Sequence, residues 1–498
     1  MQNYIQQFQE LAPAQPFHLT EHGFDNPAAF DLHAVYFDAQ LEYFKLTAWN
    51  RFANYPLLYI IPLDISPFIR RSAVPAAERL TAASNYLKNV QDFAESAEKN
   101  LNQPIPLALA EQSIALINSQ IQFHKQELAH FSASVKYIDI AAQFRKSSEA
   151  AIAAFQLLQS HIQKLSTGTA SYATDGSDIF FKILLSSDMI STTANELQQL
   201  LYEDMANNRE RMRIFADKMK LAPADALEQL GKRKPAAEHA LSNIEEIIQN
   251  LHYFLSRRHI VTAPEHLHCA IYATKPYMRN GSAFLDAPGP FEEQPLRARL
   301  FVTLPESEWS PKKQNAWMEK LSIYGMANTV AHEIWPGHYL QFQRLKTAPT
   351  AAAKIFTSQT FIEGWAHYAE EMIIDHGFGK TDFGYGVQQA QMALLRDCRA
   401  MIALQTATGA ITADDAANLI MQETFLPEIR ARHEAARSMK DPFVYSYSVG
   451  KIFMKQFLAA LRNQHTEWDT QRLHDSALRF GAPPIPLLLQ ALRKTPQE

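Results

Sequence analysis

Long stretches of this chain repeat apolar residues every three to four positions, which is the spacing of one face of an α-helix. The pattern is clearest over residues 80–101, 110–131, 137–165 and 236–255. Helix-favouring residues dominate these stretches, and the chain has only 16 glycines in 498 residues. The pattern therefore predicts a mainly α-helical protein.

One region departs from the helical spacing. Residues 270–305 are rich in proline and glycine, and 296–304 alternates so that Ala298, Leu300 and Val302 share one face. Alternation of this kind predicts a β-strand, and 268–273 is its candidate partner. We expect a small antiparallel sheet ahead of the motifs described below.

The segment after this sheet predicts a helix. Ser310 is a suitable N-cap and Pro311 suits the first helical position. The apolar positions that follow predict one helix continuing to Val330 and His332.

Chain length and composition bound the organisation. A chain of 498 residues exceeds one ordinary core, so we expect two helical lobes within a single helical domain over residues 1–498, with the candidate boundary in the loop-like segment 166–178. Apolar residues make up 47% and charged residues 20%, as in soluble proteins. The net charge of -5 argues against nucleic acid as a partner.

Targeting and cysteine content add three expectations. No apolar run is long enough for a membrane span, and the first residues lack the features of a secretory signal, so we expect a cytoplasmic protein without a membrane partner. Cys269 and Cys398 are expected to be free thiols. The sequence gives no indication of oligomeric state.

The segment His332-Glu-Ile-Trp-Pro-Gly-His338 carries the candidate chemistry. Zinc peptidases place two histidines on a helix with a glutamate beside the first, because neutral imidazoles bind zinc and the glutamate takes a proton from a metal-activated water. Here the second histidine is at i+6 rather than i+4, which on an ideal helix leaves the side chains roughly 120° apart. Pro336 and Gly337 favour a bulge or break that returns His338 to the face of His332.

A third ligand is expected from the helical segment 361–377. Glu363, His367 and Glu370 lie at i, i+4 and i+7 and so share one stripe of that helix. Charged groups on an otherwise apolar helix require a partner, and a metal supplies one. We assign Glu363 as a ligand, and His367 and Glu370 as residues that orient the ligating imidazoles. Glu371 and Asp375 are interpreted as a solvated face.

The two motifs, His332-Glu-Ile-Trp-Pro-Gly-His-Tyr-Leu-Gln341 and Glu363-Gly-Trp-Ala-His-Tyr-Ala-Glu370, resemble those of a bacterial family known as domain of unknown function 885. The likeness is strongest over about residues 270–460, within a motif-bearing region at 268–460. The arrangement also resembles the helical gluzincin peptidases, such as angiotensin-converting enzyme, thimet oligopeptidase and thermostable carboxypeptidases.

The gluzincin resemblance implies two helical lobes around a deep cleft. It implies zinc held by His332, His338 and Glu363, with Glu333 as the general base. The family resemblance also selects Tyr447, three residues before Gly450, as a donor to the oxyanion. A core packing role for this tyrosine is the alternative. Arg399 is the candidate that binds a substrate carboxylate.

The leading functional hypothesis is therefore zinc-dependent hydrolysis of peptide bonds, with short peptides as substrates. In this hypothesis the strand 296–304 pairs with an extended peptide. A non-catalytic peptide-binding protein that keeps the fold is one alternative. A carboxylate-bridged di-metal oxidase is another, because Glu127–His130 and Glu265–His268 both have the Glu-x-x-His spacing.

Overall fold

The computed structural model describes residues 53–71, 74–167, 176–279, 281–292, 297–355 and 357–494. Most of these residues are helical, as the spacing of apolar positions predicts. The expected loop at 166–178 falls largely outside the described residues, because 168–175 are not among them. The division into two lobes around a cleft stays a prediction.

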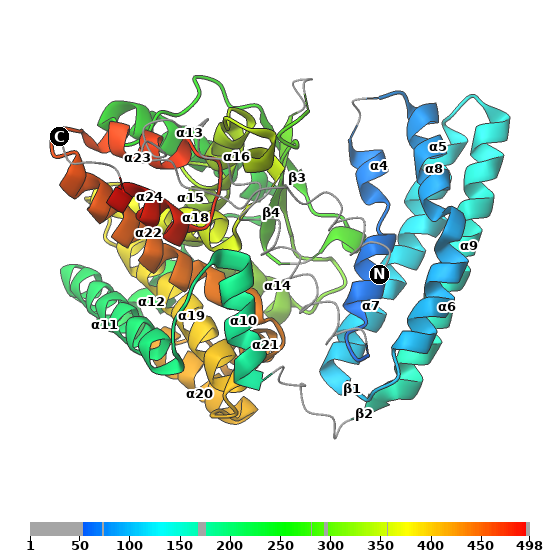
Figure 1. Cartoon of the computed structure of the whole chain (residues 1–498), viewed down its shortest axis with the longest axis horizontal. Helices are drawn as coiled ribbons and strands as arrows, with labels where there is room; N and C mark the ends of the chain where they lie inside the picture. The colour runs from blue at the N-terminus through cyan, green and yellow to red at the C-terminus, as the bar shows by residue number, and fades with distance from the viewer. Residues whose placement is uncertain are drawn as a thin grey trace.

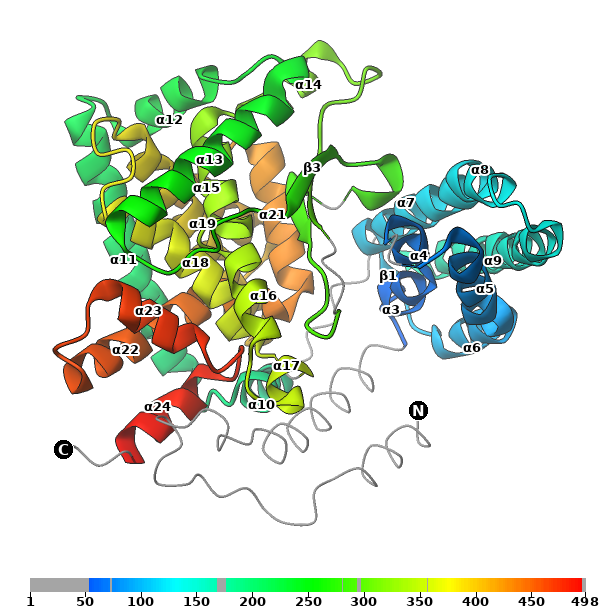
Figure 2. The same cartoon turned by 90° about the horizontal axis from the view of Figure 1, so that it is seen from above.

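The first part of the described chain is a group of helices that gathers on one side of the molecule in both views (Figures 1 and 2). Its helices are α3 (Leu57–Ile60), α4 (Ser66–Arg70), α5 (Ala76–Tyr86), α6 (Val90–Asn100), α7 (Leu107–Phe123), α8 (Ala129–Ala133) and α9 (Ile138–Leu165). A two-residue parallel pairing of β1 (Ile105–Pro106) with β2 (Ser166–Thr167) ties the start of α7 to the end of α9. Three of the predicted helical segments fall in this group.

The second part holds the motif region and a larger set of helices. They are α10 (Gly176–Asp188), α11 (Ala194–Lys218), α12 (Pro223–Lys232), α13 (Ala240–Arg258), α14 (Pro311–Lys320), α15 (Ile323–Glu333), α16 (His338–Lys346), α17 (Ala351–Ile355), α18 (Gln359–Asp375), α19 (Gly384–Ala407), α20 (Ala413–Thr424), α21 (Glu428–Lys440), α22 (Tyr445–Gln464), α23 (Thr470–Leu478) and α24 (Ile485–Lys494).

The sheet is mixed rather than antiparallel. Strand β3 (Cys269–Ala273) pairs with β5 (Ala298–Val302) in parallel, and β4 (Ala283–Asp286) pairs with β5 in antiparallel register, giving the order β3-β5-β4. The predicted partner segment is correct but its direction is wrong. Strand β4 lies between β3 and β5 in the sequence and runs opposite to both. The chain therefore reverses twice, and β5 runs in the same direction as β3.

The two faces of β5 contact different cores. Ala298, Leu300 and Val302 belong to the core built with α13, α15 and α18, as the alternation predicts. Phe301 points the other way and joins the core of the first helical group. The sheet thus lies between the two parts of the chain, and its strands occupy that place in Figures 1 and 2.

The helix predicted from Ser310 to His332 is two helices. Ser310 caps α14 by accepting from the backbone N–H of Lys313, as expected. The helix then ends at Lys320, and Ser322 caps α15 by accepting from the N–H of Gly325 at 3.2 Å. A second serine cap thus interrupts an apolar pattern that reads as continuous.

Two smaller expectations can be checked. Cys269 and Cys398 are free thiols, as predicted. Over the described ranges, no helix has the length and hydrophobicity of a membrane span.

Candidate metal centre

The two histidines of the motif are brought together by a break between helices. Helix α15 ends at Glu333 and α16 begins at His338, so the intervening residues are not helical. A Cβ atom at Gly337 would collide with the backbone carbonyl oxygen of His332, so only glycine fits there. The indole N–H of Trp365 donates to the carbonyl of Pro336 at 2.9 Å and fixes the break against α18. The predicted break is confirmed.

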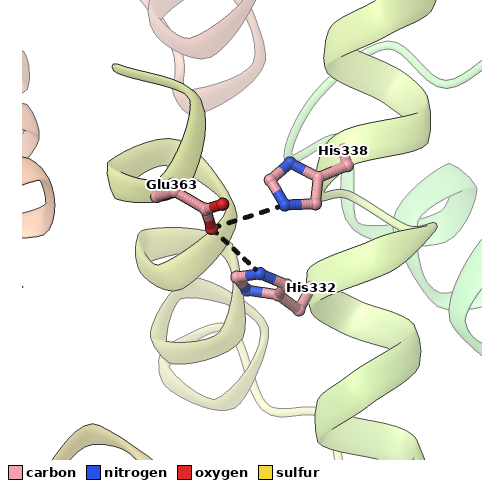
Figure 3. Close-up of side chains that lie close together, drawn as sticks. All are labelled: His332, His338 and Glu363. Atoms are coloured by element: carbon pink, nitrogen blue, oxygen red, sulfur yellow. Dashed lines mark ion pairs between the residues drawn. The ribbon is translucent and has the colours of Figure 1, made fainter. Parts of the chain in front are cut away.

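Glu363 meets both imidazoles from the opposite side. One oxygen of its carboxylate, Oε2, lies 3.4 Å from Nε2 of His332 and 3.6 Å from Nε2 of His338. Figure 3 shows both contacts ending on that single oxygen, with α18 facing the two histidine-bearing helices. One ligand atom from each residue lies within 4.8 Å of the others, and this is the grouping expected from the sequence.

Glu370, one of the two predicted orienting residues, contacts the other side of His332. Its Oε1 lies 2.8 Å from Nδ1 of that imidazole. Arg396 donates to both oxygens of Glu370, at 2.7 and 3.1 Å, and the side-chain amide of Asn328 donates at 2.9 Å. A carboxylate held this firmly fixes the ring, so that Nε2 of His332 points at Glu363.

His367, the other predicted orienting residue, does not reach the ligating imidazoles. It is fully buried, and its Nδ1 lies 3.7 Å from Oε2 of Glu370. Neither ring nitrogen of His367 has a hydrogen-bond partner among the described residues. Burial and the nearby cations lower its pKa to about 4, which keeps the ring neutral.

The charges of the centre favour a cation. Burial opposes the protonation of His332, but the carboxylates of Glu363 and Glu370 outweigh it and raise the pKa of His332 to about 9. Burial likewise opposes ionisation of Glu363, yet the two imidazoles hold its pKa below the ordinary range. The site therefore stabilises positive charge at the position between the three side chains.

Three buried atoms of the centre lack hydrogen bonds of good geometry among the described residues. They are Oε2 of Glu363, Nδ1 of His338 and Nδ1 of His332, although the last lies 2.8 Å from Oε1 of Glu370. A buried carboxylate oxygen without a donor is costly, and a coordinated cation satisfies it.

Glu333 ends α15 beside the ligand set. Its carboxylate is half-buried and lies near both ligating histidines and the backbone of Leu285 in β4. Burial raises the pKa of Glu333 above its usual range, with the nearby imidazoles acting against it. A raised pKa suits a group that takes up a proton near neutral pH.

Tyr447 faces the centre from α22. Its ring lies 6.1 Å from the ring of His332 at an angle of 24°, and burial and the charge of Glu363 raise its pKa to about 12. Tyr445 points elsewhere, because its hydroxyl donates to Asp188 at 2.8 Å. The two tyrosines, two positions apart on one helix, therefore point in different directions.

The position of Tyr447 depends on a close helix crossing. Gly364 of α18 and Gly450 of α22 meet so closely that a Cβ on either would clash with the backbone of the other helix. This contact holds the helix that carries Glu363 directly against the helix that carries Tyr447.

Arg399, the predicted substrate-binding residue, is engaged inside the protein. Its Nε and Nη2 donate to Oε2 of Glu434 at 2.9 and 2.6 Å. Sequence reasoning missed Arg396 and Asn328, which hold Glu370. Arg396 lies three residues before Arg399, so a second cation on the same stripe of α19 was the available signal.

Comparison with known proteins identifies the family of this chain. Residues 21–492 match the family model "Bacterial protein of unknown function (DUF885)", and the chain belongs to that family. The match covers almost the whole chain, well beyond residues 270–460, where the sequence resemblance is strongest. No curated protein matches.

Two solved structures share the fold. A candidate lipoprotein of unknown function from Shewanella oneidensis superposes with a TM-score of 0.75 at 18% identity, over 99% of this chain and 90% of that one. A candidate lipoprotein from Colwellia psychrerythraea gives 0.71 at 14% identity, over 84% of this chain and 76% of that one. At these identities the likeness concerns the fold alone.

Proposed function

We propose that this protein is a zinc-dependent hydrolase that cleaves peptide bonds of short peptides, with zinc held by His332, His338 and Glu363. The observation that carries the proposal is the shared oxygen of Glu363, which faces both imidazoles and has no hydrogen-bond donor. The half-buried carboxylate of Glu333 beside this group supports hydrolysis rather than simple metal storage.

The donor set fits zinc. Two neutral imidazoles and one carboxylate are the ligands of many catalytic zinc sites, which leave a fourth position open. Tetrahedral zinc with bonds of about 2.0–2.1 Å separates its ligand atoms by about 3.4 Å. The separations of 3.4 and 3.6 Å are close to that value.

The chain's residues then have separate roles in the reaction. Bound zinc would supply a Lewis acid that activates water and polarises the carbonyl of the peptide bond. Glu333 takes the proton from the attacking water and passes it to the leaving amine. Tyr447 donates from its hydroxyl to the oxygen that becomes negative in the transition state. Glu370 keeps His332 in the tautomer that presents Nε2.

Substrate pairing belongs to β4 in this proposal, not to β5. Both edges of β5 are already paired, with β3 and with β4, so the predicted role of 296–304 as the pairing strand is wrong. β4 is an outer strand of the sheet, and its residue Leu285 lies beside Glu333. An extended peptide that adds to β4 would therefore pass next to the general base.

The substitution Glu333→Gln tests the proposal. The amide has nearly the same shape but cannot accept the proton of water, so turnover should fall by about 10²–10⁴ while zinc stays bound. Elemental mass spectrometry measures zinc, and a mixed peptide library read by mass spectrometry measures turnover. Unchanged turnover with zinc in place would exclude Glu333 as the base. Absence of turnover by the unmodified, zinc-loaded protein would favour the non-catalytic peptide-binding alternative.

The di-metal alternative has less support. Glu127 is ion-paired with Lys275, and His268 directly precedes β3. In the portion of the chain that the structure describes, the one group of ligand side chains found close together is His332, His338 and Glu363. A cytoplasmic location, and the absence of nucleic-acid and membrane partners, remain predictions.

A further inference from the structure

A second group of charged side chains lies on α19 and α21, outside the ligand set. Helix α21 carries Arg430, Glu434 and Arg437 at i, i+4 and i+7, which places them on one stripe. This helix packs against α19, which carries Arg396 and Arg399. Four guanidinium groups thus gather where these two helices meet.

Only two of the four have carboxylate partners. Arg396 is bound to Glu370, and Arg399 is bound to Glu434. Among the described residues, neither Arg430 nor Arg437 forms an ion pair with a carboxylate. Glu434 is bound to Arg399, and Glu319 near Arg430 and Asp441 near Arg437 are not within ion-pair distance of those arginines. Within the described part of the chain, the guanidinium groups of Arg430 and Arg437 therefore lack a carboxylate in direct contact.

One of the two unpaired cations, Arg437, adjoins the candidate metal centre. Arg437 interacts with the hydroxyl of Tyr447, whose ring lies 6.1 Å from that of His332. Arg437 is exposed and Arg430 is half-buried, so a ligand in solution can reach both. Lys320 adds a further charge near Arg430, and its pKa falls to about 8 because of burial and that neighbour.

We propose that Arg430 and Arg437 form a subsite that binds a carboxylate of the peptide substrate, next to the bond that is cleaved. The planar guanidinium fork matches a carboxylate better than any other common anion of a peptide. A bound anion also relieves the repulsion between the cations of the stripe. The carboxylate comes from the C-terminus of the peptide or from an acidic side chain. This inference rests on the proposed hydrolytic function for its class of substrate.

Binding measurements with three matched peptides test the subsite. The probes are acetyl-Ala-Ala-Ala with a free carboxylate, the same peptide as its amide, and the amide of acetyl-Ala-Glu-Ala. Zinc-loaded Glu333→Gln protein is used, so that no probe is consumed, and affinity is measured by titration calorimetry. A carboxylate probe should bind about 10- to 100-fold more tightly than the neutral amide. If the free-acid peptide binds more tightly, the subsite takes the C-terminal carboxylate. If the Glu-containing amide binds more tightly, it takes an acidic side chain.

Variants then locate the binding groups. Adding Arg437→Gln or Arg430→Gln should reduce the preference to about threefold or less, whereas Arg437→Lys should keep part of it. The control is Arg432→Gln on the same helix, since Arg432 is exposed and already paired with Asp414 at 2.7 Å. Its preference should match that of the parent protein.

Each result separates this subsite from the proposed function. Equal affinity for all three probes would overturn the subsite, even if the unmodified protein hydrolyses peptides. A preference that survives both Arg437→Gln and Arg430→Gln would also overturn it, because the carboxylate would then bind the metal or another residue. A preference lost in those variants would support the subsite, even if no peptide is hydrolysed.

Discussion

Helix α18 contributes to two buried polar groups that differ in whether a lysine or arginine of the protein neutralises their carboxylates. The first is the metal centre of His332, His338 and Glu363. The second, here called the Lys451 cluster, consists of Lys451, Asp204, Glu371 and Asp397. Glu363 and Glu371 lie on the same helix, eight residues apart. One helix therefore supplies a carboxylate to each group.

In the Lys451 cluster, lysine side chains of the protein neutralise the carboxylates. Lys451 lies 2.7 Å from Asp204 and 3.6 Å from Glu371. Ser448 and Asn208 donate to the two oxygens of Asp397 at 2.5 and 2.7 Å. Burial, and then the charge of Asp204, raise the pKa of Asp397. Asp397 therefore binds a proton more readily, which lowers the negative charge of the cluster. The charges of the cluster thus balance within the protein, although Nζ of Lys451 is itself buried without a hydrogen bond of good geometry.

The metal centre has no such cation, because among the described residues Glu363 is paired with no lysine or arginine and meets only the two imidazoles. Its Oε2, and Nδ1 of both histidines, are buried without hydrogen bonds of good geometry. Buried polar groups are normally satisfied, and exceptions indicate an absent ion, water or substrate. The contrast teaches that burial and charge alone do not identify a site. A candidate site is indicated by several potential ligand atoms that converge on one point without a cation among them. The variants below test this difference between the metal centre and the Lys451 cluster.

The largest effect should come from His338→Ala. Removing one of three ligands should reduce zinc from about one ion per chain to a small fraction of that value. The stability of the metal-free protein should change much less, because the centre contributes through the metal. Elemental mass spectrometry and urea unfolding of the chelated protein measure the two effects. Full zinc occupancy in this variant would contradict the ligand assignment.

Lys451→Met should show the opposite behaviour. It leaves the carboxylate of Asp204 buried without its cation, and Glu371 with Lys455 alone, at a cost of about 3–5 kcal/mol of unfolding free energy. Zinc content of the folded protein should remain unchanged. Lys455→Met is the control, because Lys455 is half exposed and its pair with Glu371 is worth about 1 kcal/mol or less. Equal losses of unfolding free energy in the two variants would show that Lys451 is not the cation on which the cluster depends.

Tyr447→Phe and Tyr445→Phe sharpen the comparison. Tyr447 faces the metal centre, whereas Tyr445 donates to a buried carboxylate that is satisfied within the protein. Loss of the Tyr447 hydroxyl should lower kcat by about 10²–10³ with little change in stability. Loss of the Tyr445 hydroxyl removes a donor from buried Asp188 and should cost about 1–3 kcal/mol of stability. Turnover and thermal unfolding are measured for both. A larger kcat loss in Tyr445→Phe would reverse the assignment.

The smallest effect should follow Glu370→Gln, which alters the support of a ligand and not the ligand itself. The amide orients His332 less firmly, so zinc affinity should fall by about 10- to 100-fold. Competition with a chromophoric chelator measures that affinity. His367→Gln serves as the comparison, because His367 does not touch a ligating imidazole and should leave zinc affinity nearly unchanged. An equal loss in both variants would mean that packing, rather than orientation, is responsible.

The sequence predicted the parts of the site that depend on local spacing. The break before His338 follows from Pro336 and Gly337, and the shared stripe of Glu363 and Glu370 follows from helical periodicity. Glu371 was wrongly interpreted as solvated. Its partner Lys451 lies on α22, and only the packing of distant helices brings the two together.

The sheet shows the same limit. Alternation identified the buried face of β5, but β4 carries no clear alternation and was missed. Without β4, the sequence could not determine that β3 and β5 run in the same direction. Direction depends on how many times the chain reverses, and no local pattern records that number.

The glycine contact between α18 and α22 allows these two helices a single register. A slide of one helical turn, about 5.4 Å, would bring Ser446 or Met454 to the position of Gly450. Neither residue fits where even a single Cβ collides with the backbone of α18. A slip by one turn, which would carry Tyr447 away from Glu363, is therefore sterically excluded, so two glycines, unlike the metal ligands in chemistry, act as the spacer that sets the height of the wall of the candidate site.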